Sequence, residues 1–177
     1  MGRQQRVKVK NSFSEWQNVT SGIPQGSVLG PLLFVIFIND LPAQIRNSEI
    51  YLFADDLKIF KGISSVNDCT LLQDDITHAY EWTKTSLLKF HPQKCKYMRI
   101  GNRDKPSIQY ELGEPPQELI KSDKEKDIGI TIDSNLTFDQ HIIDKINSIL
   151  GLKSRTFEYK DIQTILTLYK SVIRPHL

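Results

Sequence analysis

The sequence contains little cysteine: Cys69 and Cys95 are the only two in 177 residues. They lie far apart and no histidine pattern accompanies them, so we expect neither a zinc site nor a disulfide framework. The first residues, Met1 to Arg6, are charged where a secretory signal would be apolar. We therefore expect an intracellular protein, cytoplasmic or nuclear, that is not secreted.

Long hydrophobic runs are also missing. The most apolar stretch, Val28 to Ile38, is interrupted by Gly30 and Pro31, and it falls far short of the roughly 20 residues that a membrane span requires. We expect no membrane association, and we interpret this stretch as a buried helix.

A strong net charge is the third missing feature. The formal charge of +2 is too small to indicate nucleic-acid binding by itself. Positive charge gathers at both ends, with four basic residues against one acid in residues 1–20 and six against two in residues 145–177. Such ends would suit a phosphate backbone, but scattered lysines on helices are more often a solvated face.

The most informative feature that is present is Phe53-Ala54-Asp55-Asp56. The residues on either side, Glu49 to Phe53 and Leu57 to Phe60, are rich in β-branched and aromatic types, which predicts a hairpin with the acids at its tip. A turn there would let two neighbouring carboxylates converge on a divalent cation such as Mg²⁺. For an isolated Asp-Asp pair, a solvated turn remains the alternative.

A second motif, Gly22 to Pro31, reads Gly-Ile-Pro-Gln-Gly-Ser-Val-Leu-Gly-Pro. Its glycines would let backbone approach a ligand closely. We expect Ser27 to cap the following helix and Pro31 to lie in its first turn. The amino-terminal end of a helix favours phosphate, but a plain junction between a loop and a buried helix would look similar, and the composition leaves both interpretations open.

The two motifs belong to a longer series that continues, in order, with Glu81-Trp82, Lys94-Cys95, Asp127-Ile128-Gly129-Ile130 and Val172-Ile173-Arg174-Pro175-His176-Leu177. Across nearly the whole chain, the series resembles non-LTR (LINE-type, jockey-like) retrotransposon reverse transcriptases. The resemblance implies an α+β fold: a polymerase palm-type antiparallel sheet backed by helices in residues 1–133, followed by a partial helical thumb in residues 134–177.

The resemblance also implies roles for individual residues. Asp55 and Asp56 would be catalytic and bind metal in a two-ion Mg²⁺ site, and Lys94 would donate a proton to the pyrophosphate leaving group. The substrate-binding positions would be Gly22, Gln25, Gly26 and Ser27 around the incoming nucleotide and template base, with Phe53 and Ala54 near the primer end. The implied partners are an RNA template, a DNA primer and deoxynucleoside triphosphates, and the chemistry is two-metal nucleotidyl transfer.

One element of the family's pattern has no counterpart. The family carries a third metal-binding aspartate upstream of the Gly-Pro-Gln-Gly loop, and this sequence has no Asp before Asp40. We therefore expect a truncated palm, without fingers, from an RNA-directed DNA polymerase, with no autonomous activity. The alternatives are a non-catalytic nucleic-acid-binding remnant and an inert interaction fragment, with self-association through an exposed sheet edge.

The remaining patterns predict scaffold. Trp16 and Trp82 are assigned to packing. The expected elements are an amino-terminal hairpin in residues 6–20, a helix opened by a capping box of Ser65 and Asp68, strands at 95–100 and 128–132, and two carboxyl-terminal helices opened by a Thr137–Gln140 capping box and by Asp161.

Overall fold

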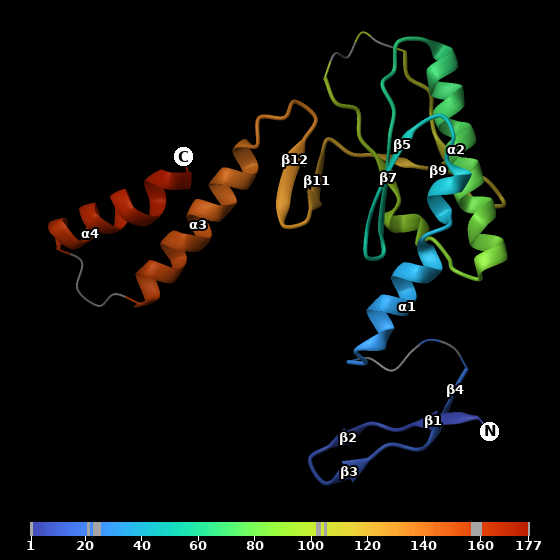
Figure 1. The fold of residues 1–177 in the computed structure, drawn as a ribbon. Coiled ribbons are helices and arrows are strands. Elements are labelled where there is room, and N and C mark those ends of the chain that lie inside the picture. The colour runs from blue at the N-terminus through green and yellow to red at the C-terminus, as the bar shows by residue number, and fades with distance from the viewer. Residues whose placement is uncertain are drawn as a thin grey trace. The chain divides into compact units, whose positions relative to one another are not determined.

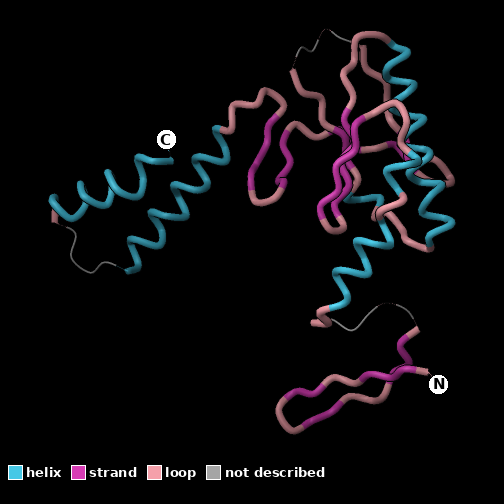
Figure 2. Tube along the Cα trace, viewed as in Figure 1, coloured by secondary structure: helices cyan, strands magenta, loops and turns pink. Residues whose placement is uncertain are grey.

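The computed structural model describes residues 2–20, 22, 26–101, 104, 106–156 and 161–176. The chain forms two compact units, Met1–Lys61 and Gly62–Leu177, and each is considered by itself below. Both contain helices and small two-stranded sheets (Figures 1 and 2). The mixed α and β content agrees with the predicted fold class, and the division into palm and thumb at residue 133 stays a prediction.

The first unit opens with a long hairpin. Its outer pair joins β1 (Arg3–Gln5) to β4 (Gln17–Val19), and its inner pair joins β2 (Lys8–Val9) to β3 (Ser12–Phe13), all antiparallel. Lys10 begins the turn with a φ of 53°. The predicted amino-terminal hairpin is confirmed, and nearly all of its side chains are exposed.

The apolar stretch forms helix α1 (Leu29–Ile38), but the prediction that this helix is buried is wrong. Leu29 is 61% exposed and Ile36 64%, and within the helix only Ile38 is buried. Burial continues just beyond it at Leu41, in the 3₁₀ turn η1 (Leu41–Gln44). An apolar run makes burial favourable, but burial also needs a facing surface, which the run itself does not provide. No helix in the described part of the chain is long and apolar enough to cross a membrane.

The second unit is built on helix α2 (Val66–Ser86). The Ser65 side chain accepts a hydrogen bond from the Asp68 backbone N–H, and the Asp68 carboxylate accepts one from the Ser65 N–H, which confirms the predicted capping box. Trp82 is 7% exposed, in agreement with a packing role. The Gln73 amide donates to the Glu111 carbonyl and accepts from the Glu111 N–H, both at 2.9 Å, and so joins α2 to strand β8 (Glu111–Leu112).

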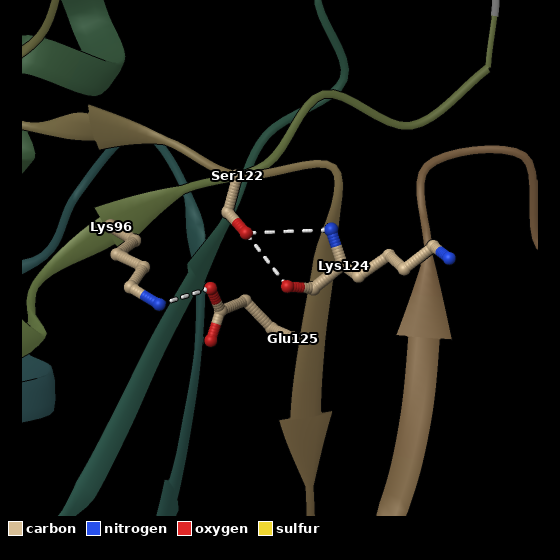
Figure 3. A network of polar contacts seen from close by, with 4 residues as sticks. All are labelled: Lys96, Ser122, Lys124 and Glu125. Atoms are coloured by element: carbon tan, nitrogen blue, oxygen red, sulfur yellow. Dashed lines mark hydrogen bonds and ion pairs between the residues drawn. The ribbon is translucent and has the colours of Figure 1, made fainter. Parts of the chain in front are cut away.

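A 3₁₀ turn, η2 (Pro92–Lys94), follows the helix. Short strands come next: β7 (Lys96–Tyr97), β8 (Glu111–Leu112), β9 (Gln117–Glu118) and β10 (Ile120–Lys121). The predicted strand at 95–100 is thus only two residues long, paired in parallel with β10. Lys96 also contacts Glu125 at 2.7 Å (Figure 3). Burial would raise the pKa of Glu125, but the hydrogen bonds from Lys96 and Ser122, together with the charge of Lys96, outweigh burial and leave this pKa below its ordinary value.

The predicted strand at 128–132 is part of a hairpin. Strand β11 (Lys124–Asp127) pairs with β12 (Ile130–Asp133), and Ile128 and Gly129 form the turn between them with φ of 45° and 84°. The first two residues of the predicted strand are therefore the turn. Glycine adopts this backbone region freely, and so it supports a turn at a place where the apolar pattern indicated a continuous strand.

The chain ends in helices, and the bounds are α3 (Asp139–Thr156), α4 (Ile162–Leu168), a π-helical turn η3 (Tyr169–Ile173) and a 3₁₀ turn η4 (Arg174–His176). Asp161 caps α4 as predicted, accepting from the Gln163 and Thr164 N–H groups. The Thr137–Gln140 capping box is wrong: the Thr137 hydroxyl donates to Asp133 at 3.2 Å. Helix α3 begins at Asp139, and the Asp133 carboxylate binds the N–H groups of Thr137 and Phe138 just before it.

Candidate active site

The two adjacent carboxylates lie at the tip of a regular hairpin, as predicted. Strand β5 (Glu49–Phe53) pairs antiparallel with β6 (Asp56–Phe60), and the register closes with Phe53 opposite Asp56. Ala54 and Asp55 are therefore the two-residue loop, and Ala54 has a φ of 51°. A positive φ at the first loop position is shared by the two turn types that fit the right-handed twist of a hairpin.

The pairing assigns the hairpin residues to two faces. Residues directly opposite each other in an antiparallel pair share a face, so Asp56 lies on the same face as Phe53. Tyr51 shares this exposed face because it is two residues from Phe53 on one strand. Its ring meets the Phe60 ring edge to face with 5.5 Å between centroids.

The Tyr51 hydroxyl also donates to the Glu49 carboxylate at 2.9 Å. This hydrogen bond and the charge of Glu49 raise the pKa of Tyr51. The sequence analysis missed the contact, although the spacing of two residues on one strand face was a signal that could have revealed it. The contact ties two side chains together on the face that carries Asp56.

Asp55 and Asp56 are both exposed. Neither carboxylate has an ion pair or a side-chain hydrogen bond with any residue that the structure describes. Carboxylate oxygens are the donors that Mg²⁺ prefers, so the chemistry of the pair fits that ion. The described residues contain no group of three or more His, Cys, Asp or Glu that could hold a metal, so the pair provides only part of a coordination shell.

The strained loop position gives a stability prediction. We expect Ala54→Val to lower the free energy of unfolding by about 1–2 kcal/mol, because a β-branched residue tolerates positive φ poorly. We expect Ala54→Gly to raise it by up to about 1 kcal/mol, because glycine adopts the same backbone without strain. Urea denaturation of the two variants beside the parent measures both changes. Equal stability of all three proteins would contradict a positive φ at this position.

The predicted nucleotide loop is only partly within the described residues. Gly22 and Gly26 have φ of 82° and 81°, and among the described residues no atom beyond the adjacent ones lies within 4 Å of where a Cβ would be on either. The Gly22 carbonyl accepts a hydrogen bond from the Arg3 guanidinium at 2.5 Å. Gln25 lies outside the described residues. A Cβ at either glycine would therefore meet open space among the described residues, and the predicted ligand contact of this loop stays a prediction.

The predicted capping role of Ser27 is wrong. Helix α1 is preceded by Val28, which is already in the helical region with φ −64° and ψ −33°, and no side chain caps the helix. The Ser27 carbonyl instead accepts from the Gly30 N–H at 3.3 Å. Pro31 lies in the first turn, as predicted. Val28 occupies the capping position, and Ser27 lies one residue before it.

Lys94 is the one predicted catalytic residue outside the first unit. It ends the 3₁₀ turn η2, it is exposed, and its backbone N–H donates to the His91 carbonyl at 2.9 Å. The structure therefore brings together Phe53, Ala54, Asp55 and Asp56 at one hairpin tip in the first unit, while Lys94 belongs to the second unit.

Comparisons with known proteins agree with these motifs. A family model described as reverse transcriptase (RNA-dependent DNA polymerase) matches residues 3–159. The chain is 34% identical over 151 residues to a probable RNA-directed DNA polymerase from transposon BS of Drosophila melanogaster, covering 77% of this chain and 16% of that protein.

Two further relatives come from the same organism. The RNA-directed DNA polymerase from mobile element jockey is 30% identical over 145 residues, covering 77% of this chain and 16% of that protein. The probable polymerase from transposon X-element is 26% identical over 189 residues, covering 99% of this chain and 20% of that protein. The chain thus spans a fifth or less of the length of these relatives. No solved structure shows a significant match.

Proposed function

We propose, since the chain belongs to the reverse transcriptase (RNA-dependent DNA polymerase) family, that its β5–β6 hairpin presents Asp55 and Asp56 to a primer end and an incoming nucleotide. Its relatives are polymerases of non-LTR transposons. The observation that carries the proposal is the hairpin tip, which is held by five paired positions on each strand: the exposed Asp55 lies in the two-residue turn and the exposed Asp56 is the first residue of β6. The paired strands limit how far the two carboxylates can move. An unpaired, solvated loop would not limit them in this way.

Asp55 and Asp56 would hold Mg²⁺. When bound, the ions would supply activation of the primer hydroxyl and neutralisation of the triphosphate charge. Phe53 shares the face of Asp56, and we propose that its exposed ring contacts the primer terminus beside Ala54. Lys94 would protonate the departing pyrophosphate.

The loop residues would shape the nucleotide pocket. Gly22 and Gly26 offer open backbone, which supports close approach by the incoming nucleotide and template base. Gln25 and Ser27 are proposed for the same pocket on the family resemblance. The RNA template, DNA primer, deoxynucleoside triphosphates and an intracellular location belong to this proposal.

The number of carboxylates limits what the hairpin can do alone. Mg²⁺ prefers six oxygen ligands in octahedral geometry, and two side chains cannot complete that shell for a pair of ions. We therefore propose that turnover requires further ligands beyond Asp55 and Asp56, and that this chain by itself binds substrate without extending it. Nucleic-acid binding without turnover is the second candidate function, and the exposed cations on the amino-terminal hairpin favour it.

Metal binding by the hairpin can be tested without activity. In a ¹⁵N-labelled sample, we expect Mn²⁺ to broaden the amide signals of residues 54–57, with an affinity of the order of 1 mM. The variant Asp55→Asn with Asp56→Asn should lose this broadening, because the amides remove the charged donors. Asp74→Asn, which removes an exposed acid on α2, should keep it. Broadening that spares residues 54–57 would contradict a metal role for the pair.

A further inference from the structure

The amino-terminal hairpin contains an irregularity between its two paired regions. Gln5 pairs with Gln17 and Lys8 pairs with Phe13. Two residues on the first strand therefore face three on the second, as in a β-bulge, which bends a strand and redirects its side chains. The Val7 N–H donates to the Ser14 hydroxyl and the Ser14 N–H to the Val7 carbonyl, both at 2.9 Å, and these bonds fix the bulge.

The bulge gathers two cations and two aromatic rings on one face. The Arg6 guanidinium carbon lies 4.0 Å from the centroid of the Phe13 ring and 4.6 Å from that of Trp16. The Lys8 ammonium lies 5.3 Å from the Phe13 centroid. All three distances are within the range of about 6 Å for cation–π attraction. Trp16 was assigned to packing from the sequence, and its partner is a cation.

The cluster remains largely open to solvent. Phe13 is 50% exposed and Trp16 54%, and Arg6 and Lys8 are exposed as well. Each ring therefore keeps surface that the guanidinium does not cover. Such contacts would stabilise a two-stranded hairpin, which is only marginally stable by itself. The two half-exposed rings and the cations beside them also form a surface that is both aromatic and positively charged.

The chemistry of this surface matches a nucleic-acid strand. Stacking on a ring engages the flat face of a guanidinium and leaves its in-plane N–H edge available to grip a phosphate with two hydrogen bonds. Exposed aromatic rings accept unpaired bases by stacking. Residues 1–20 carry four basic side chains and one acidic side chain, Glu15, so the whole hairpin attracts a polyanion.

We infer that Arg6, Lys8, Phe13 and Trp16 form a binding site for unpaired nucleotides, the hairpin face. Arg6 and Lys8 hold phosphates, and the open sides of Phe13 and Trp16 stack bases. The inference deepens the proposed function and rests on it for the source of the strand, which would be the single-stranded template ahead of synthesis. The site itself uses neither Asp55 nor Asp56.

Fluorescence anisotropy of a labelled oligouridine of about 12 nucleotides, titrated with the full chain, tests the hairpin face. We expect Trp16→Leu and Arg6→Gln each to weaken binding by about 5-fold or more, the range found when one stacked aromatic is lost. Trp16→Phe retains a ring and should bind better than Trp16→Leu. Val9→Thr changes an exposed residue outside the cluster, 64% exposed, and should leave affinity unchanged.

Further titrations identify the kind of nucleic acid that binds. Oligouridine and oligothymidine of equal length distinguish RNA from DNA, and affinity for either should fall as salt is raised from about 50 to 200 mM. A preference for duplex over both single strands would overturn the inference. It would also be overturned if Trp16→Leu bound as tightly as Val9→Thr, or if Trp16→Phe bound as weakly as Trp16→Leu.

The result of the oligouridine titration can be distinguished from the result of the Mn²⁺ test of the metal site. The double variant Asp55→Asn with Asp56→Asn should bind oligouridine as tightly as the parent. Its two substitutions lie at the tip of the β5–β6 hairpin, whereas the hairpin face belongs to the amino-terminal hairpin. RNA binding that depends on Trp16, found together with an absence of Mn²⁺ broadening, would support the hairpin face and contradict the catalytic proposal. The reverse pair of results would contradict the hairpin face alone.

Discussion

Primer extension is expected to fall by at least about 10³-fold when Asp55 is replaced by Asn in a polymerase that carries this chain. The protein for this test is a chimaera in which the chain replaces the matching segment of the jockey polymerase, which is 30% identical over 145 residues. The relative supplies the ligands and nucleic-acid contacts that the hairpin lacks. Asn keeps the shape of the side chain but loses the charge that holds Mg²⁺, so the effect reports metal binding and not folding.

The controls separate catalysis from assembly. Asp74→Asn in the same chimaera should extend primers normally, because that carboxylate lies on α2 and not on the hairpin. The Asp55→Asn and Asp74→Asn chimaeras should bind template and primer equally. The isolated chain should show no extension above its own Asp55→Asn variant. Extension by the isolated chain that Asp55→Asn abolishes would contradict the need for further ligands, and extension that survives Asp55→Asn in the chimaera would contradict the role of Asp55.

Asp133→Ala is expected to cause the largest loss of stability. The Asp133 carboxylate is buried and accepts hydrogen bonds from the N–H groups of Asn135, Thr137 and Phe138 at 2.9, 3.2 and 2.7 Å, and from the Thr137 hydroxyl at 3.2 Å. These bonds hold the connection from β12 to α3, where Leu136 and Phe138 have positive φ. Alanine would leave the donors unpaired, and we expect the melting temperature to fall by about 5 °C or more.

The pH dependence of stability provides a second readout for Asp133. Burial would raise the pKa of its carboxyl group, but the hydrogen bonds from Thr137, Phe138 and Asn135 outweigh burial and lower this pKa below the ordinary 3.8. A lowered pKa in the folded state means that the stabilisation is complete above pH 3.8 and is lost as the pH falls through the folded value. Below that value the carboxyl is protonated in both states and contributes nothing through its charge.

Asp133→Asn is the matched control, because it retains the shape and one acceptor oxygen. Its melting temperature should lie between those of the parent and Asp133→Ala near neutral pH. As the pH is lowered from about 6 to 2, the difference between the parent and Asp133→Asn should shrink. Thermal melts followed by circular dichroism measure both trends. A difference that is constant across this range would show that the charge of Asp133 does not stabilise the fold.

The correct predictions concern structure that neighbouring residues make among themselves. The 49–60 hairpin follows from two runs of β-branched and aromatic residues around a short polar tip. The Ser65 capping box and the Asp161 cap need only the residues two or three positions away. The motifs at Gly22–Pro31 and Asp55-Asp56 likewise identified the family, which the match over residues 3–159 confirms.

The wrong predictions involve residues that had a local alternative. Thr137 was predicted to cap α3, but the helix begins only at Asp139. The Thr137 N–H and hydroxyl both donate instead to the Asp133 carboxylate, a charged acceptor that forms stronger hydrogen bonds than a neutral one. Ser27 lies one residue before the capping position, which Val28 occupies. The Val28 to Ile38 pattern correctly predicted a helix, but it could not predict how much of that helix would be covered.

The sequence by itself therefore determined the family, the secondary structure around each motif and the position of two carboxylates at a hairpin tip, because each depends on interactions over a few residues. Only the tertiary structure decided that α1 is exposed, that Asp133 organises the entry to α3, and that Arg6 lies between Phe13 and Trp16. The exposure of α1 and the Arg6 contacts depend on how segments separated in the chain meet, whereas the Asp133 contacts depend on the backbone turn in which Leu136 and Phe138 have positive φ. Such contacts depend on strand register and on the presence of a facing surface, neither of which is encoded at a single position.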